Sequence, residues 1–302
     1  MGKIMSRRKT SILTIANKKG GVGKTASTVS LASCFAKQKK VLVIDFDPQA
    51  NATSNLGLKN EVKKTGKSIS KAIADESITA EDIILPTAFE NLFCIGSDNS
   101  LQNYRDKFLG HPRQFNLLDT VLQSDIIAEF DMVLIDTNPS RCVLYSSAMA
   151  ASDYYIIPVF PEKNSLEGIA DEISAAENIR KYHNNMLLFL GCAITKYDKN
   201  NSTHKKVEQF MRESSKHGNF RVFNTLIPSS NHIPAASYQN TPINVYRENA
   251  DISHAYTILA GEIIPHLKGR RVGRVTNQPN LSVLNEAQHK FDEITQVAPI
   301  LN

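Results

Sequence analysis

The sequence predicts an α/β fold in which a doubly wound, mostly parallel sheet carries helices on both faces. Short, nearly continuous runs of Val, Ile and Leu alternate with stretches of helical spacing, and strands of this composition are buried on both faces. In such sheets ligands bind at the carboxyl ends of the strands, so the residues after each run are candidates for a site. Five apolar runs of strand length occur, at residues 12–16, 41–44, 132–135, 155–159 and 187–194.

The composition supports a globular protein and excludes several other classes. A chain of 302 residues with 41% hydrophobic and 22% charged residues can bury a large core, and it is too apolar for global disorder. The 35 Lys and Arg against 30 Asp and Glu leave a net charge of +5, which permits a polyanionic partner without requiring one. The four cysteines stand singly, without a CxxC pair, as expected of core residues in a reducing compartment.

Neither a secretory signal nor a membrane span is evident in the sequence. Residues 1–10 are polar and basic, but the apolar run that follows is too short for the h-region of a signal peptide. No run approaches the roughly 18 to 20 apolar residues that cross a bilayer. We therefore expect a cytoplasmic protein.

Three parts are expected along the chain. Residues 1–10 form an N-terminal arm, residues 11–268 form one large domain, and residues 269–302 form a basic hinge with a helical extension. Within the large domain, residues 58–88 are more polar, and we expect them to form helix and loop at the edge of the sheet.

The extension contains one expected helix, between residues 281 and 300. Its apolar side chains fall at helical spacing, whereas Glu286, Asp292 and Glu293 leave its polar face acidic. An acidic face is repelled by anionic lipid. We therefore expect this helix to pack on the domain or on a partner.

A Gly-rich turn follows the first apolar run and precedes a stretch of helical character at residues 26–36. From Asn17 to Thr25 it reads NKKGGVGKT. Such a turn points consecutive backbone N–H groups into one concavity at the positive end of a helix, where a polyphosphate can be held. Lys24 would reach the β- and γ-phosphates, and the Thr25 hydroxyl would bind Mg²⁺, which bridges phosphate oxygens.

This turn contains more lysine than one nucleotide site needs. The general phosphate-loop pattern GxxxxGK[ST] has glycine where this chain has Lys18, and Lys19 follows directly. Lys19 and Lys24 place two ammonium groups close together, which requires more negative charge than one such loop usually holds. Lys19 therefore needs a further anion.

Carboxylates stand at the ends of the second and third apolar runs. Asp45 and Asp47, at i and i+2, could order the waters around Mg²⁺ and the attacking water. Asp136 would hold the metal through water. A lone aspartate at a strand end is often only a helix N-cap, but the order of these motifs along the chain favours the nucleotide site.

These residues resemble the motifs of the ParA partition ATPases and their MinD-like relatives. KGGVGKT, from Lys19 to Thr25, is similar to the deviant Walker A motif of that family. DFDPQANAT, which starts at Asp45, resembles DxDPQxNAT, and DMVLIDTNPS, which starts at Asp131, resembles the Walker B stretch DxxxIDTPPS. Less specific matches follow at 158–168, 194–198, 225–228 and 241–243, so the resemblance spans roughly residues 10–268.

The resemblance implies an ATPase that uses ATP and Mg²⁺. Lys19, Lys24 and Asp47 would be the catalytic residues: Lys19 would reach across a homodimer to the partner's ATP, and Asp47 would position or activate the attacking water. Thr25 would bind the metal directly, and Asp45 and Asp136 would bind it through water. The implied ATP-binding residues are Lys19, Gly20, Gly21, Val22, Gly23, Lys24, Thr25 and Ala26.

The chain departs from the family pattern in three places. Ala26 and Ser27 replace further threonines, which leaves Thr25 as the only hydroxyl expected to be well placed for the metal. Asn138 replaces the first proline after the Walker B aspartate and adds a donor beside the γ-phosphate. Residues 229–232 read SSNH where the family commonly has two arginines that grip DNA, so fewer phosphate contacts are expected there.

Other cations could replace the missing arginines, although such charges are more often a solvated face. The candidate DNA-binding residues are Arg221, Arg270, Arg271 and Arg274. Further cations are available at Lys199, Lys205, Lys206, Arg212 and Lys216.

The resemblance implies an ATP-dependent partition ATPase for a plasmid or chromosome, located in the cytoplasm on the nucleoid. An ATP-sandwich homodimer would bind DNA non-specifically, and a ParB-like centromere-binding partner would stimulate hydrolysis and release the DNA. No stable membrane association is expected. The alternative is a MinD-like positioning ATPase that acts on a membrane or protein scaffold. A nitrogenase-type iron protein would need paired cluster cysteines, and Cys94 and Cys142 lack that context.

Overall fold

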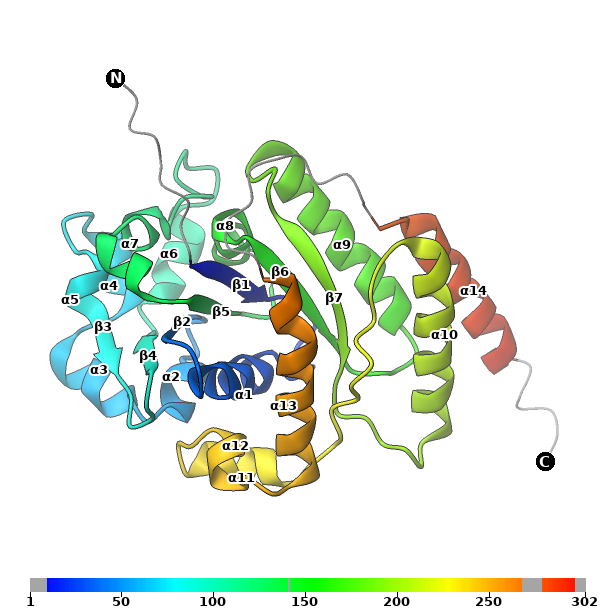
Figure 1. Cartoon of the computed structure of the whole chain (residues 1–302). Helices are drawn as coiled ribbons and strands as arrows, with labels where there is room; N and C mark the ends of the chain where they lie inside the picture. Colours follow the sequence, from blue (N-terminus) through cyan, green and yellow to red (C-terminus); the bar gives the residue numbers. More distant parts are fainter. Residues whose placement is uncertain (1–9, 141, 268–278, 297–302) are drawn as a thin grey trace.

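A seven-stranded sheet forms the centre of the molecule, in the order β3-β4-β2-β5-β1-β6-β7 (Figure 1). Neighbouring strands run parallel except β3 and β4, which are antiparallel. The computed structural model describes residues 10–140, 142–267 and 279–296. The strands are β1 (Ser11–Ile15), β2 (Val41–Phe46), β3 (Ile84–Pro86), β4 (Leu92–Ile95), β5 (Met132–Thr137), β6 (Tyr154–Val159) and β7 (Leu188–Ile194).

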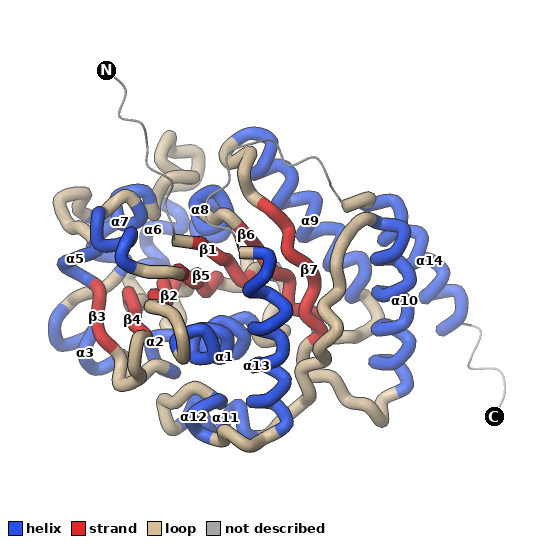
Figure 2. Tube along the Cα trace, in the orientation of Figure 1, coloured by secondary structure: helices blue, strands red, loops and turns tan. Residues whose placement is uncertain are grey.

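Helices cover the sheet and connect its strands (Figure 2). Those in the first half of the chain are α1 (Lys24–Ala36), α2 (Asn51–Asn55), α3 (Lys59–Thr65), α4 (Ile69–Ala74), α5 (Ala80–Ile83), α6 (Leu101–Lys107), α7 (Asp119–Leu122) and the 3₁₀ turn η1 (Asp125–Glu129). Those in the second half are α8 (Val143–Ala151), α9 (Ser165–Tyr182), α10 (Ser202–Gly218), α11 (His232–Tyr238), α12 (Ile243–Tyr246), α13 (Asp251–Ile263), the 3₁₀ turn η2 (Ile264–His266) and α14 (Leu281–Gln296).

Both faces of the sheet are buried. Successive residues of a strand point to opposite faces. In β1, Leu13 and Ile15 therefore pack with residues of α1 and α13, whereas Ile12 packs with residues of α4, α6 and α8 on the other face. The doubly wound, mostly parallel sheet predicted from the apolar runs is confirmed.

All five predicted strands are present, with ends that differ from the apolar runs by one or two residues. Strands β3 and β4 were not predicted from the sequence, because strands of three and four residues carry too little periodicity to be recognised. The polar segment at 58–88 forms α3, α4 and α5 at the sheet edge, as expected, but it also contains the edge strand β3, which was not expected. Helix α1 begins at Lys24, two residues before the predicted start.

The C-terminal helix α14 lies against α9 and α10 (Figure 1). Leu284, Ala287 and Phe291 are buried in one cluster with side chains of those two helices. The Phe291 ring meets the Phe210 ring edge-on at a centroid distance of 5.6 Å. The helix therefore packs on the domain, which is one of the two arrangements expected of it. The division of the chain after residue 268 stays a prediction, since residues 268–278 lie outside the described part.

Candidate nucleotide-binding site

The Gly-rich turn between β1 and α1 has the geometry of a phosphate-binding loop. Gly21 and Gly23 have φ angles of +75° and +86°, in the left-handed region that favours glycine. Gly23 is the N-cap of α1, so the free N–H groups of the first helical turn face the loop. Thr195 Oγ1, just after β7, donates a hydrogen bond of 2.8 Å to the Val22 carbonyl oxygen. This bond attaches the loop to the end of the edge strand β7.

Lys24 lies on the inner side of the loop and is buried. Its Nζ donates to the Lys19 carbonyl oxygen at 2.9 Å. Burial lowers the pKa of Lys24, and the nearby carboxylates of Asp136 and Asp47 oppose this shift. An ammonium group carries three donors, so Lys24 can keep this bond and still bind phosphate oxygens.

Asp45 and Asp136 are paired in register on the adjacent strands β2 and β5, and both are fully buried. The Thr25 hydroxyl donates to one oxygen of Asp136 at 2.7 Å. Asp45 accepts from the backbone N–H and the hydroxyl of Thr53, each at 2.7 Å. Burial, and secondly the charge of Asp45, raise the pKa of Asp136 to about 8, while burial raises the pKa of Asp45 to about 6. A bound cation would stabilise the ionised form of both carboxyl groups.

The residues around this carboxylate pair fit Mg²⁺ bound together with a polyphosphate. Mg²⁺ takes oxygen ligands, keeps several waters, and usually has only one or two protein ligands beside the phosphates. Thr25 and Asp136 supply that oxygen chemistry at the mouth of the loop. In the described ranges, no group of three or more His, Cys, Asp or Glu side chains could hold a metal by itself. The ion would therefore need phosphate oxygens to complete its shell.

Asp47 lies just beyond the end of β2 and is largely buried. One of its oxygens accepts from the Gln49 backbone N–H at 2.9 Å. Burial raises the pKa of Asp47, and the hydrogen bond from Gln49 and secondly the charge of Lys24 oppose this effect. A desolvated carboxylate beside the buried lysine is suited to orient a water molecule.

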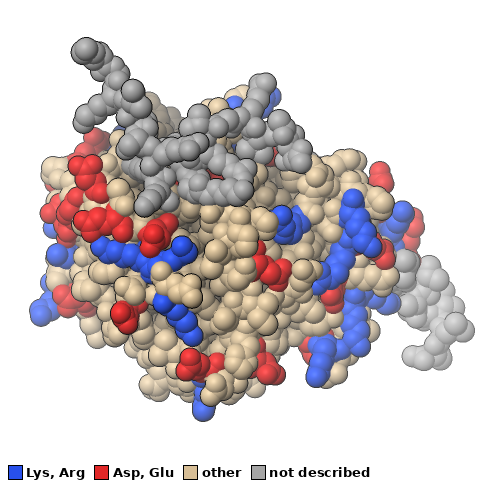
Figure 3. All heavy atoms as spheres, viewed as in Figure 1, with Lys and Arg blue, Asp and Glu red and all other residues tan. Residues whose placement is uncertain are grey.

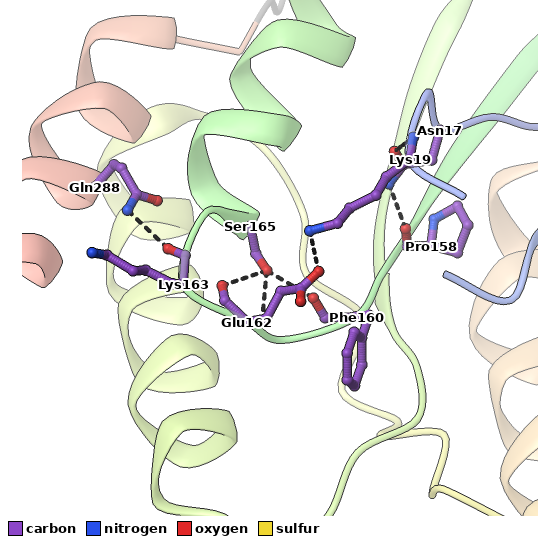
Figure 4. Close-up of polar contacts among 8 residues, drawn as sticks. All are labelled: Asn17, Lys19, Pro158, Phe160, Glu162, Lys163, Ser165 and Gln288. Atoms are coloured by element: carbon purple, nitrogen blue, oxygen red, sulfur yellow. Dashed lines mark hydrogen bonds and ion pairs between the residues drawn. The ribbon is translucent and has the colours of Figure 1, made fainter. Parts of the chain in front are cut away.

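The Lys19 side chain points toward the turn before α9 (Figure 4). Asn17 fixes the backbone there, because its Oδ1 accepts from the Lys19 N–H and its Nδ2 donates to the Pro158 carbonyl oxygen, each at 2.8 Å. The Lys19 ammonium group forms an ion pair with Glu162, in the turn before α9. The two loop lysines thus point to different partners.

Comparison with known proteins identifies the family. A family model described as an AAA domain matches residues 10–189. The sporulation initiation inhibitor protein Soj of Bacillus subtilis is 31% identical over 253 residues, which cover 83% of this chain and 97% of Soj. The chromosome-partitioning ATPase Soj of Thermus thermophilus is 30% identical over 266 residues, 87% of this chain and 99% of that protein. The chain belongs to the ParA/Soj family of partition ATPases.

A solved structure supports the same assignment. A plasmid partition protein from Borrelia burgdorferi, bound to AMPPNP, superposes with a TM-score of 0.71 at 29% identity. The match covers 85% of this chain and 99% of the other.

Two side chains beside the loop of this ParA/Soj protein, those of Thr28 and Glu172, were not predicted from the sequence. Thr28 was not recognised because Thr25 was expected to be the only well-placed hydroxyl, yet the Thr28 hydroxyl donates to the second oxygen of Asp136 at 3.0 Å. The spacing of three residues on one helix face could have indicated it. Glu172 is fully buried on α9 and accepts from the Lys18 N–H at 3.1 Å and from the Tyr145 hydroxyl. No sequence signal distinguishes it from other residues of a long helix.

Asn138, which replaces the first proline after the Walker B aspartate of the ParA/Soj motif, is turned toward α8. Its Nδ2 donates to the Ser140 hydroxyl at 2.9 Å, and the Cys142 thiol lies 3.6 Å from its Oδ1. The donor that the sequence placed beside the γ-phosphate is therefore engaged with the residues that lead into α8.

The candidate DNA-binding residues are only partly described. Arg270, Arg271 and Arg274 lie outside the described residues. Arg221 is exposed, donates through Nη1 to the Leu190 carbonyl oxygen at 3.2 Å, and lines a groove with Arg180 and Lys216 beside β7.

Proposed function

We propose that this protein is an ATP-driven DNA partition ATPase whose ATP-bound subunits form a sandwich homodimer. The separation of the two loop lysines carries the proposal. Lys24 is buried against its own loop, whereas the side chain of Lys19 is 43% exposed and reaches the turn before α9. A cation held outward beside a phosphate loop is suited to bind the phosphates of a second subunit.

The surface in front of the loop leaves room for such a partner. Lys18, Lys19, Pro139 and Gly168 line an open hollow of about 580 Å³ between the loop and the start of α9. A partner subunit docked over this hollow would bring its own nucleotide to Lys19. The two lysines of a symmetric dimer would then cross in both directions.

The proposed hydrolysis uses the residues at the strand ends. Lys24 and the backbone N–H groups of residues 20–26 would hold the phosphates, and Thr25, Asp45 and Asp136 would hold Mg²⁺, the aspartates through water. Bound Mg²⁺ neutralises charge that develops on the phosphate oxygens. Asp47 orients the attacking water from its desolvated position. Lys19 of the partner subunit adds charge only in the dimer, so hydrolysis is linked to dimer formation.

The proposal also includes DNA binding and the stimulation of ATP hydrolysis by a partner protein. Basic side chains gather over α10 in Figure 3, and Lys205, Lys206 and Lys216 on that helix are exposed. Arg212 is less available, since it pairs with Glu208 at 2.9 Å. We infer that the ATP dimer binds DNA without sequence preference through such cations, in the cytoplasm and on the nucleoid. A ParB-like centromere-binding partner would then stimulate hydrolysis and release the DNA.

A DNA-binding measurement across a salt series tests this function. Plasmid DNA is titrated with the protein in ATP, in ADP and without nucleotide, from low to physiological salt. We expect binding only with ATP, and a linear fall of log K with log salt whose slope counts the phosphate contacts. Equal binding in ADP and ATP, or binding to anionic vesicles in place of DNA, would contradict the proposal.

The packing of α14 argues against binding of this protein to a membrane, and it therefore favours DNA as the surface on which the protein acts. Leu284, Ala287 and Phe291 of this helix are buried in one cluster with side chains of α9 and α10, so they are not free to enter a bilayer. None of the described helices is both long enough and apolar enough to span a membrane. An amphipathic anchor would require α14 to detach from a core that includes Leu284 and Phe291.

A further inference from the structure

The turn before α9 connects Lys19 to the C-terminal helix (Figure 4). Glu162 in this turn pairs with the Lys19 ammonium group, and Gln288 of α14 contacts the backbone of the same turn. We propose that Glu162 and Gln288 are positioning residues that hold Lys19 on its own subunit until an ATP-bound partner competes for it. The inference rests on the sandwich dimer proposed above.

The turn itself is well ordered by local hydrogen bonds. Ser165, the first residue of α9, has its Oγ 2.7 Å from the carbonyl oxygens of both Phe160 and Glu162. The same oxygen accepts from the Glu162 backbone N–H at 2.8 Å. The backbone that carries the Glu162 carboxylate is therefore fixed relative to α9, which directs the carboxylate toward Lys19.

Gln288 attaches this turn to α14. Its side-chain amide donates to the Lys163 carbonyl oxygen at 2.9 Å, and its oxygen accepts from the Glu167 N–H at 3.4 Å. Gln288 is only 8% exposed. A buried amide costs free energy unless it is hydrogen-bonded, so the contact specifies where α14 and the turn lie relative to each other.

The strength of the ion pair suits a restraint that a partner can overcome. The Lys19 and Glu162 side chains are 43% and 39% exposed, and pairs of this kind change an equilibrium by only about two- to fivefold. Charge-assisted contacts to phosphate are stronger. Lys19 would therefore exchange Glu162 for the phosphates of a partner subunit with bound ATP, but it would stay paired with Glu162 when the partner carries no nucleotide.

A neighbouring ion pair offers a matched control. Lys18, one residue before Lys19, pairs with Asp171 of α9, and both side chains have similar exposure to those of the first pair. Asp171→Asn removes a loop-to-helix pair without affecting the lysine that is proposed to cross. Only Glu162→Gln should therefore change dimer formation.

Hydrogen exchange tests the contact of Gln288 in the nucleotide-free protein, independently of any dimer. Gln288→Ala removes the contact with the turn and the contact with the start of α9, and Gln288→Glu keeps the side-chain volume but removes the N–H donor. For both variants we expect amide exchange in a peptide covering residues 160–168 to become about two- to tenfold faster. Asn285→Ala, an exposed change on α14, should leave that exchange unchanged. Unchanged exchange in both Gln288 variants would overturn the role of Gln288.

Sedimentation with AMP-PNP and Mg²⁺ tests the restraint on Lys19. We expect Glu162→Gln to lower the apparent dimer dissociation constant by about two- to fivefold. Gln288→Ala should act in the same direction, and the double variant should not exceed the effect of Glu162→Gln. An unchanged or weaker dimer in Glu162→Gln would overturn the inference. If the parent protein stays monomeric, the proposed function fails, whereas the exchange result still decides whether Gln288 orders the turn.

Discussion

Thr25 Oγ1 and Asp136 Oδ2 lie 2.7 Å apart, so the first turn of α1 is joined to the end of the central strand β5. Thr28, one turn further along α1, donates to the other oxygen of the same carboxylate at 3.0 Å. The two hydroxyls orient Asp136 before any metal binds. If Mg²⁺ binds Thr25 directly, as proposed, Thr28 would remain to hold the carboxylate in place.

Replacing Thr28 by valine should weaken the proposed Mg²⁺ site without removing a ligand. Thr28→Val keeps the side-chain shape but leaves one oxygen of the buried Asp136 without its donor. Loss of such an outer contact typically costs about tenfold in metal affinity. We expect the Mg²⁺ concentration for half-maximal ATP hydrolysis to rise by about that factor. Thr28→Ser should restore it, and an unchanged Mg²⁺ titration in Thr28→Val would exclude this role.

Replacing Asp47 by alanine should separate ATP binding from hydrolysis. Asp47 lies beyond β2 and is not among the residues proposed to hold the phosphates, so Asp47→Ala should bind ATP nearly as the parent does. Removal of a group that orients the attacking water should slow hydrolysis by about 100-fold or more. The ATP dimer should then persist in size-exclusion chromatography.

A surface change provides the control for Asp47→Ala. Glu90→Ala, in the exposed turn between β3 and β4, should hydrolyse ATP at the parent rate. If Asp47→Ala also retains that rate, a different residue positions the water.

Much of the site could be predicted from the sequence because its information is local. The phosphate loop needs glycine at two positive φ angles, at Gly21 and Gly23, and a lysine and threonine directly after the second. Asp45 and Asp136 stand at the ends of apolar runs, and the parallel sheet places such ends at one edge. The spacing of the motifs therefore predicted which residues of the site would face the nucleotide.

Contacts between distant segments could not be predicted in this way. Glu162 and Lys19 are far apart in sequence and meet only because β1 and β6 are adjacent in the sheet. Gln288 resembles any polar residue of an amphipathic helix until α14 packs on α9. The short strand β4 was missed for another reason, since four residues carry too little pattern.

Replacing Lys19 by alanine should spare nucleotide binding by the monomer and abolish the dimer. Lys19→Ala removes two charge-assisted contacts from a symmetric sandwich, one from each subunit. At about 1.5–3 kcal/mol each, their loss should weaken ATP-dependent dimerisation by about 100-fold or more. Light scattering with AMP-PNP measures it, and Lys63→Ala, an exposed lysine on α3, is the control. A normal ATP-dependent dimer in Lys19→Ala would refute the crossing role.

Asp136 should make the stability of the metal-free protein depend on pH. Burial and the charge of Asp45 raise the pKa of Asp136 to about 8 in the folded protein, whereas an unfolded aspartate titrates near about 3.9. Between these values the folded state binds the extra proton. Its contribution is fully present below about pH 4 and is lost as the pH rises toward 8, with a slope of at most about 1.4 kcal/mol per pH unit.

Asp136→Asn isolates this contribution, because asparagine keeps the shape but does not titrate. Its Oδ1 can accept from one of the two threonine hydroxyls, and its Nδ2 can donate to the other. In EDTA, we expect urea unfolding of Asp136→Asn to show a flatter pH dependence than the parent from pH 5 to 8. The variant should be the more stable of the two at pH 8, where the parent buries a charge. Addition of Mg²⁺ and ATP should reverse that order, since only the parent can use the carboxylate to bind the metal. Parallel pH profiles in EDTA would show that Asp136 is already ionised in the metal-free fold at pH 5.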